Sequence, residues 1–258
     1  MKKHRGNRSA ARGWAGSLPS ILEIESSTRC NIHPPCVMCY PRIFDKRHIS
    51  YDISDSAFER LVPFLRGFKT ISLHGVGEPL LGGKLMALLD NIDREKTWVQ
   101  FNSNGLLLTE EMSRAFISKK LSMIDFSLDA ATRETYRKIR RSNFDLVVGN
   151  IKRLTRIKQE LEVDRPVIKV NMTLMKENES ETGAFVDLAR ELGAGIIHLG
   201  LLNPTENYEV RNGEFVFNYH DQMVDVKLPG FRAAVNEARA KAQSYGIELV
   251  TEFSGYYT

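Results

Sequence analysis

The sequence predicts an α/β protein in which parallel strands alternate with helices and close into a full or partial barrel. Short apolar runs bounded by turn residues alternate with longer segments of helical periodicity. This alternation favours parallel strands joined by right-handed crossovers. Active sites of such folds lie at the carboxyl ends of the strands, and the unusual residues of this chain follow its apolar runs. Fold class and site position are therefore predicted together.

Seven apolar runs have the length of strands. They cover residues 21–25, 70–74, 98–101, 123–128, 167–174, 196–202 and 247–250. We therefore expect about six strand–helix units and a last short strand.

Helix signals lie between these runs. Ser54 can cap a helix that Pro63 must bend or shorten. Thr109 precedes two glutamates, which favour a helix N-terminus. Apolar residues repeat at helical spacing over residues 144–157. These signals predict three helices.

A further helix is expected to end at Gly193, because glycine often terminates helices. Asn178 and Glu181 fit a capping box at its start. Residues 203–228 fit no strand–helix unit, and their aromatic residues among polar ones indicate a cap or an inserted hairpin.

Length and composition indicate one soluble globular domain. The chain has 258 residues, of which 42% are hydrophobic and 26% charged. No apolar run could span a bilayer, and no apolar stretch follows the N-terminal charges. The net charge of +4 is too small to indicate nucleic-acid binding. Residues 1–17 are basic and suggest a mobile tail, or an arm that touches an acidic partner.

The three cysteines, Cys30, Cys36 and Cys39, lie within ten residues of one another. A disulfide framework would spread an even number along the chain. A clustered odd number suits metal ligation in a reducing compartment, so we expect a cytoplasmic protein. Three thiolates can hold three corners of an iron–sulfur cubane and leave one iron open. Zinc with His33 or His48 as fourth ligand, or ordinary buried cysteines, are the alternatives.

Polar residues follow the next three apolar runs. Gly77 and Glu78 end the second, Asn104 ends the third, and Ser127 and Asp129 end the fourth. A carboxylate and exposed backbone groups could bind a cationic amine, and glycine permits close approach. Structural turns, or helix capping by Asp129, would explain each motif separately. Together they would meet at one barrel mouth.

With these motifs in place, the chain resembles the radical S-adenosylmethionine (radical SAM) superfamily, specifically members with a C-terminal SPASM domain. The resemblance covers residues 22–202. Its motifs are the cysteine loop, Gly-Glu-Pro-Leu-Leu from Gly77, Asn-Gly-Leu-Leu from Asn104, Ser-Leu-Asp-Ala from Ser127, Ile139-Arg140, Asn-Ile-Lys-Arg-Leu from Asn150 and Thr-Leu-Met-Lys from Thr173.

The resemblance implies a partial (β/α)6 TIM-like barrel over residues 18–202 and a C-terminal cap or extension over 203–258. It implies a 4Fe–4S cluster on Cys30, Cys36 and Cys39 that cleaves S-adenosylmethionine to methionine and a 5′-deoxyadenosyl radical, which abstracts hydrogen from a substrate. The implied S-adenosylmethionine contacts are Tyr40, Gly77, Glu78, Asn104, Ser127, Asp129 and Arg140.

The substrate implied is a peptide, a protein or a sugar-like small molecule, and the implied reductant is a flavodoxin or ferredoxin. Two features depart from the family pattern. Five residues rather than three separate Cys30 from Cys36, and the cysteines of a SPASM auxiliary-cluster domain are absent. The chain is therefore expected to be a fragment or a member that works without them. A zinc-dependent barrel enzyme and an inactive iron–sulfur scaffold are the rival functions.

Overall fold

A computed structural model describes residues 19–39, 43, 50–203 and 205–253. The predicted tail over 1–17, together with Tyr40 and His48, lies outside the described residues.

The main sheet has seven strands, all parallel, in the order β1-β2-β3-β4-β5-β6-β9. The strands are β1 (Ile21–Glu23), β2 (Thr70–Ser72), β3 (Trp98–Ser103), β4 (Met123–Ser127), β5 (Val167–Leu174), β6 (Ile196–Leu201) and β9 (Glu248–Thr251). β1 and β9 are the edges, so the described strands form an open sheet rather than a closed barrel. The predicted partial-barrel α/β class is confirmed, and the segment expected to be a C-terminal extension adds β9.

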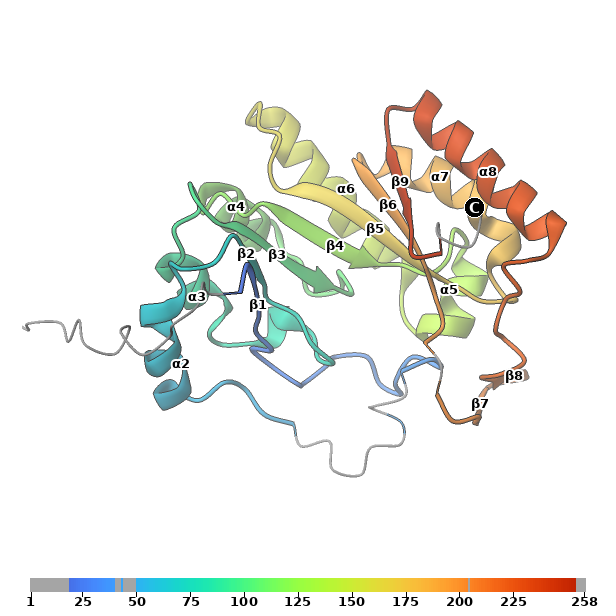
Figure 1. Ribbon diagram of the computed structural model, residues 1–258, viewed down its shortest axis with the longest axis horizontal. Coiled ribbons are helices and arrows are strands. Elements are labelled where there is room, and N and C mark those ends of the chain that lie inside the picture. Colours follow the sequence, from blue (N-terminus) through green and yellow to red (C-terminus); the bar gives the residue numbers. More distant parts are fainter. Residues whose placement is uncertain (1–18, 40–42, 44–49, 204, 254–258) are drawn as a thin grey trace, which may run out of the picture.

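Helices follow most strands, and Figure 1 shows α6 above β4 and β5 and places α7 and α8 to the right of β6 and β9 as drawn. The α-helices are α2 (Asp55–Leu61), α3 (Leu85–Asn91), α4 (Glu110–Ser118), α5 (Arg133–Arg140), α6 (Phe144–Glu160), α7 (Thr182–Glu191) and α8 (Pro229–Ser244). Short 3-10 helices are η2 (Val62–Phe64), η3 (Pro79–Leu81) and η4 (Glu179–Glu181). None of the helices in the described part of the chain has the length and apolar character needed to cross a bilayer.

Several helix ends form as predicted. The Ser54 hydroxyl accepts from the Ala57 N–H, and α2 ends at Leu61 where the 3-10 turn containing Pro63 begins. Proline lacks an N–H and clashes with the preceding turn, so it ends the α-helix. Thr109 caps α4 in the same way.

The predicted capping box before α7 is wrong. Asn178 and Glu181 make no side-chain cap at the helix start. The Asn178 amide instead donates to the carbonyls of Asp129 and Thr173, at distances of 2.8 and 2.9 Å. The Glu181 carboxylate accepts from the Ala131 N–H at 2.7 Å. Both side chains thus bind the neighbouring strand-end segments rather than their own helix.

The core lies between the sheet and its helices. Along β5, buried and half-buried residues alternate, and Ile168, Val170 and Met172 join the main hydrophobic cluster. The other face of β5 carries Lys169 and Asn171. One side of the sheet is therefore apolar and covered by helices, while the inner side is polar.

A two-stranded antiparallel hairpin separates β6 from α8. It consists of β7 (Glu209–Asn212) and β8 (Phe215–Asn218). This agrees with the hairpin interpretation of residues 203–228.

Candidate functional site

A pocket of about 420 Å³ opens at the C-terminal ends of the strands. Segments after β1 and β2 form one part of its wall, and the ends of β3, β4 and β5 form another. Its lining residues are Cys30, Ile32, Cys36, Met38, Cys39, Gly75, Val76, Gly77, Glu78, Asn102, Ser103, Asn104, Ser127, Arg140, Thr173 and Asn203. The strand-end motifs therefore meet in one pocket.

The middle cysteine of the loop is buried and held through its backbone neighbours. Cys36 is only 6% exposed, whereas Cys30 and Cys39 are half-buried. The N–H of Val37 donates to the Ile139 carbonyl at 3.0 Å, and the N–H of Cys39 donates to the Cys36 carbonyl at 3.0 Å. Burial raises the pKa of the Cys36 thiol to about 11, although the Arg140 charge opposes the shift. A metal bound to this thiol must displace its proton.

Two donor groups face the sulfur atoms. Arg140 Nη1 lies 3.8 Å from Cys36 Sγ, and Asn104 Nδ2 lies 3.9 Å from Cys30 Sγ. At Cys36 the Arg140 charge partly offsets the rise in pKa that burial causes, because a positive charge stabilises the thiolate.

Glu78 connects the turn after β2 to the end of β3. It is 2% exposed. Its carboxylate accepts from Ser103 Oγ at 2.8 Å and from the N–H groups of Asn104 at 2.7 Å and Leu80 at 3.1 Å. Burial raises the Glu78 pKa, and these hydrogen bonds, with the more distant Arg140 charge, oppose the rise. The side chain therefore fixes the geometry of both turns.

Gly77 is required by the protein's own backbone. A Cβ at this position would lie 2.2 Å from the Ser27 carbonyl oxygen and 2.6 Å from that of Arg29. The next residue, Glu78, donates its N–H to the Arg29 carbonyl at 2.6 Å. The close approach that glycine permits here is therefore between two segments of the chain.

Asp129 and Arg140 form a buried ion pair behind the cysteine wall. The Asp129 side chain is 0% exposed and that of Arg140 14%. Asp129 Oδ1 accepts from the Thr173 N–H at 2.7 Å, while Oδ2 accepts from the guanidinium. Burial alone would lower the Arg140 pKa, but the charges of Asp129 and Cys36 raise it overall. The pocket thus contains a permanent cation that Asp129 orients.

Helix capping by Asp129, the alternative considered from sequence, does not occur. The cap of α5 is Thr132, whose hydroxyl accepts from the Thr135 N–H. Asp129 has a left-handed φ of 60°, which turns the chain out of β4.

The structure brings most of the predicted cofactor residues together. Gly77, Glu78, Asn104, Ser127 and Arg140 line the pocket with the three cysteines. Asp129 lies behind Arg140, and Tyr40 falls outside the described residues. The predicted set missed four polar residues that also line the pocket, namely Asn102, Ser103, Thr173 and Asn203. Their signal was the same as for the others, a polar residue at the end of a strand.

A polar inner face continues below the pocket. Asp125 and Ser127 share one face of β4, as Lys169, Asn171 and Thr173 share one face of β5. Lys169 Nζ lies 2.7 Å from Asp125 Oδ2. Asp125 Oδ1 is buried and has no hydrogen-bond partner within the described part of the chain.

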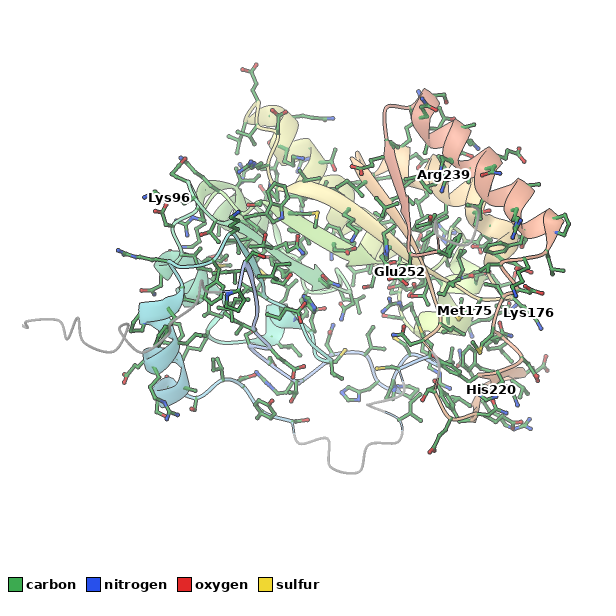
Figure 2. All side chains as sticks on the ribbon, viewed as in Figure 1. Lys96, Met175, Lys176, His220, Arg239 and Glu252 are labelled. Carbon is green, nitrogen blue, oxygen red and sulfur yellow. The ribbon has the colours of Figure 1, made fainter. Side chains whose placement is uncertain are left out.

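His198 extends this face onto β6. Its Nδ1 lies 3.1 Å from Asn171 Oδ1, and its Nε2 lies 3.5 Å from Glu252 Oε1. Glu252 directly follows β9 and is labelled in Figure 2. Burial and then the Lys169 charge lower the His198 pKa, against a smaller opposing contribution from Glu252. The ring is therefore held neutral more firmly than a free histidine.

Comparisons with known proteins agree with this arrangement. A family profile described as Radical SAM superfamily matches residues 24–189. The tungsten-containing aldehyde ferredoxin oxidoreductase cofactor-modifying protein of Pyrococcus furiosus is 23% identical over 234 residues, 90% of this chain and 64% of the relative. A probable GTP 3′,8-cyclase of Saccharolobus islandicus is 29% identical over 153 residues, 58% of this chain and 46% of the relative.

Solved structures share the fold. SuiB of Streptococcus suis bound to S-adenosylmethionine superposes with a TM-score of 0.69 at 16% identity, over 93% of this chain and 53% of SuiB. SuiB bound to its precursor peptide SuiA superposes with a TM-score of 0.68 at 15% identity, over 93% of this chain and 51% of that one. The chain thus spans from about half to just under two thirds of the length of these proteins.

Proposed function

The chain belongs to the radical SAM superfamily, and from this premise we propose that it binds a 4Fe–4S cluster and S-adenosylmethionine for radical chemistry. The observation that carries the proposal is a single strand-end pocket lined by all three cysteines and by polar residues from three strands. When bound, the cluster supplies the electron that cleaves S-adenosylmethionine to methionine and a 5′-deoxyadenosyl radical, which takes hydrogen from the substrate.

The donor set fits the cluster. Each thiolate of a cubane binds a different iron, so the ligands need not meet at one point. Cys30, Cys36 and Cys39 line one pocket. Among the described residues, no three Cys, His, Asp or Glu side chains are arranged to hold a single ion. We propose these three thiolates as the cluster ligands, in the reducing environment of the cytoplasm.

The remaining pocket residues are proposed to bind S-adenosylmethionine. Gly77, Glu78, Asn104, Ser127 and Arg140 contribute backbone groups, an amide, a hydroxyl and a guanidinium to the lining of the same pocket. These groups suit a ligand with an amine, a carboxylate and a ribose. Glu78 acts by holding the turns after β2 and β3 in place. Asp129, which lies behind the pocket lining, acts by orienting Arg140. A contact from Tyr40 is proposed on the family resemblance alone.

The substrate is proposed to be polar, in the range from peptide or protein to a sugar-like small molecule. Interiors of (β/α)8 barrels are filled mainly by branched apolar residues, whereas this inner face carries Asp125, Lys169, Asn171 and His198. Asp125 Oδ1, which has no hydrogen-bond partner among the described residues, can accept a hydrogen bond from a ligand. The peptide-bound form of SuiB supports the peptide end of this range. Flavodoxin or ferredoxin is proposed as the reductant.

Anaerobic reconstitution of the full chain tests the proposal. We expect close to four irons and four sulfides per chain and, with dithionite as reductant, formation of 5′-deoxyadenosine from S-adenosylmethionine. Cys36→Ala should retain no cubane and form no 5′-deoxyadenosine. Ser113→Ala is the matched control, because it also removes one γ atom from a buried site, on α4 away from the pocket.

Zinc as the sole stoichiometric metal after anaerobic preparation would refute the proposal. Iron binding by Cys36→Ala equal to that of Ser113→Ala would refute the assignment of this ligand.

A further inference from the structure

The β7–β8 hairpin packs against the cysteine loop through a hydrophobic cluster separate from the main core. The buried members of this cluster are Val37, Ile139, Met175, Leu202, Tyr208, Phe217 and Tyr219. Figure 1 shows β7 and β8 on the lower right, and Figure 2 labels Met175 and His220 on the same side. An isolated two-stranded hairpin is only marginally stable in water. The cluster therefore couples the hairpin to the loop, since neither has a core of its own.

A buried hydrogen bond connects the hairpin segment to the residue that follows Cys36. The Tyr208 hydroxyl donates to the Val37 carbonyl at 3.1 Å. The N–H of Val37 donates to the Ile139 carbonyl at 3.0 Å. Both backbone groups of Val37, which is 0% exposed, are thus satisfied by other segments, as a buried peptide requires.

A second connection passes through Arg141 at the end of α5. Its guanidinium donates from Nη1 to the Pro35 carbonyl at 3.1 Å and from Nη2 to the Arg211 carbonyl in β7. Asn212 Nδ2 donates to the carbonyls of Arg137 and Lys138 at 2.9 and 3.1 Å. Both carbonyls belong to the last turn of α5, where the Arg137 carbonyl also accepts from the Arg141 N–H at 3.2 Å. The hairpin, the end of α5 and the loop on both sides of Cys36 therefore form one hydrogen-bonded unit.

From this unit we infer that the β7–β8 hairpin is a clamp that holds Cys36 in place for the metal cluster, with Tyr208 and Arg141 as positioning residues. The inference rests on the proposed function for the identity of the group that the cysteine loop binds. Its structural basis is independent of that function: Cys36 lies between Pro35, bound by Arg141, and Val37, bound by Tyr208.

Thiol reactivity of the metal-free chain tests the clamp without requiring a cluster. Tyr208→Phe removes only the hydroxyl that bonds Val37. Iodoacetamide labelling, resolved by peptide mass spectrometry, should then modify Cys36 about tenfold faster, because loss of one buried hydrogen bond eases local opening. Labelling of Cys30 should stay near the parental rate. Arg141→Lys keeps the positive charge but cannot donate to the Pro35 and Arg211 carbonyls at the same time, as the guanidinium does. It should accelerate Cys36 labelling as well.

Tyr219→Phe is the matched control. It removes a hydroxyl from the same aromatic cluster, but that hydroxyl donates to the Asn203 carbonyl at 2.7 Å rather than to the cysteine loop. We expect parental Cys36 labelling in this variant. Faster labelling in both variants, or in neither, would overturn the clamp.

Cluster retention gives the second readout. After anaerobic reconstitution, Tyr208→Phe should lose iron to a chelator about tenfold faster than the parent, and Tyr219→Phe at the parental rate. Equal rates of iron loss from Tyr208→Phe and the parent would overturn the inferred role of Tyr208 in stabilising the bound cluster. A parent that binds no iron would instead refute the proposed function, while the thiol experiment still decides whether the clamp exists.

Discussion

Replacing Asp129 with asparagine tests the buried ion pair that orients Arg140 at the pocket. Asparagine suits the position, because it tolerates the left-handed φ of 60°. Its Oδ1 can still accept from the Thr173 N–H, which lies 2.7 Å from the Asp129 oxygen. The substitution therefore removes the negative charge and replaces the oxygen that accepts from the Arg140 guanidinium with an N–H donor.

The expected cost follows from burial. The Asp129 side chain is 0% exposed and that of Arg140 14%, so water replaces little of the lost interaction. Removing one partner of a buried ion pair costs about 3–5 kcal/mol. Each kcal/mol lowers Tm by about 2–4 °C in a chain of roughly this size, so we expect a fall of about 6–20 °C. Thr132→Ala, which removes the side-chain cap of α5, should cost only about 0.5–2 kcal/mol.

Urea and thermal unfolding of the reduced, metal-free chain, followed by circular dichroism, measures these differences. The double variant Asp129→Asn/Arg140→Gln should be more stable than Asp129→Asn alone, because it contains no uncompensated buried charge. If Asp129→Asn costs no more than Thr132→Ala, or if the double variant is the less stable one, the ion pair does not hold Arg140 as argued.

Three further predictions concern the strand ends and the inner face. Glu78→Ala should lose at least about 2 kcal/mol in urea unfolding, because it leaves the buried donors of Leu80, Ser103 and Asn104 unpaired; parental stability would contradict this. Gly77→Ala should lose about 1–3 kcal/mol, since its Cβ would meet the Ser27 carbonyl oxygen at 2.2 Å. Gly83→Ala, with no atom within 4 Å of its Cβ, should stay within about 0.5 kcal/mol of the parent, and similar losses in both would refute the clash. Because the folded-state pKa of His198 lies below its ordinary value of 6.5, the unfolded chain takes up the proton first, and parental stability should fall as pH drops below 6.5. His198→Gln should weaken this fall in urea midpoints measured from about pH 7.5 to pH 5, and an unchanged pH dependence would count against a neutral, half-buried ring.

The sequence by itself determined the elements and the position of the site. The run over residues 167–174 became β5 with the same bounds, and Pro63 ended α2 as expected. Strand periodicity, helix caps and proline effects depend on residues a few positions apart, so they can be read along the chain. The motifs at strand ends were also predictable as a group, because parallel strands place their carboxyl ends at one edge.

Tertiary structure alone decided which hydrogen-bond and ion-pair partners the polar residues in and around that site have. Asn178 and Glu181 fit a local capping box, yet folding brought them strand-end partners, and they bind those instead. Asp129 likewise pairs with Arg140 rather than capping a helix. A buried polar side chain bonds with whichever partners the fold supplies, and those partners can be remote in sequence. The Tyr208 hydroxyl and the Val37 carbonyl are 171 residues apart. No local pattern encodes that contact, so the connection between the hairpin and the cysteine loop emerges only when the sheet has brought the two segments together.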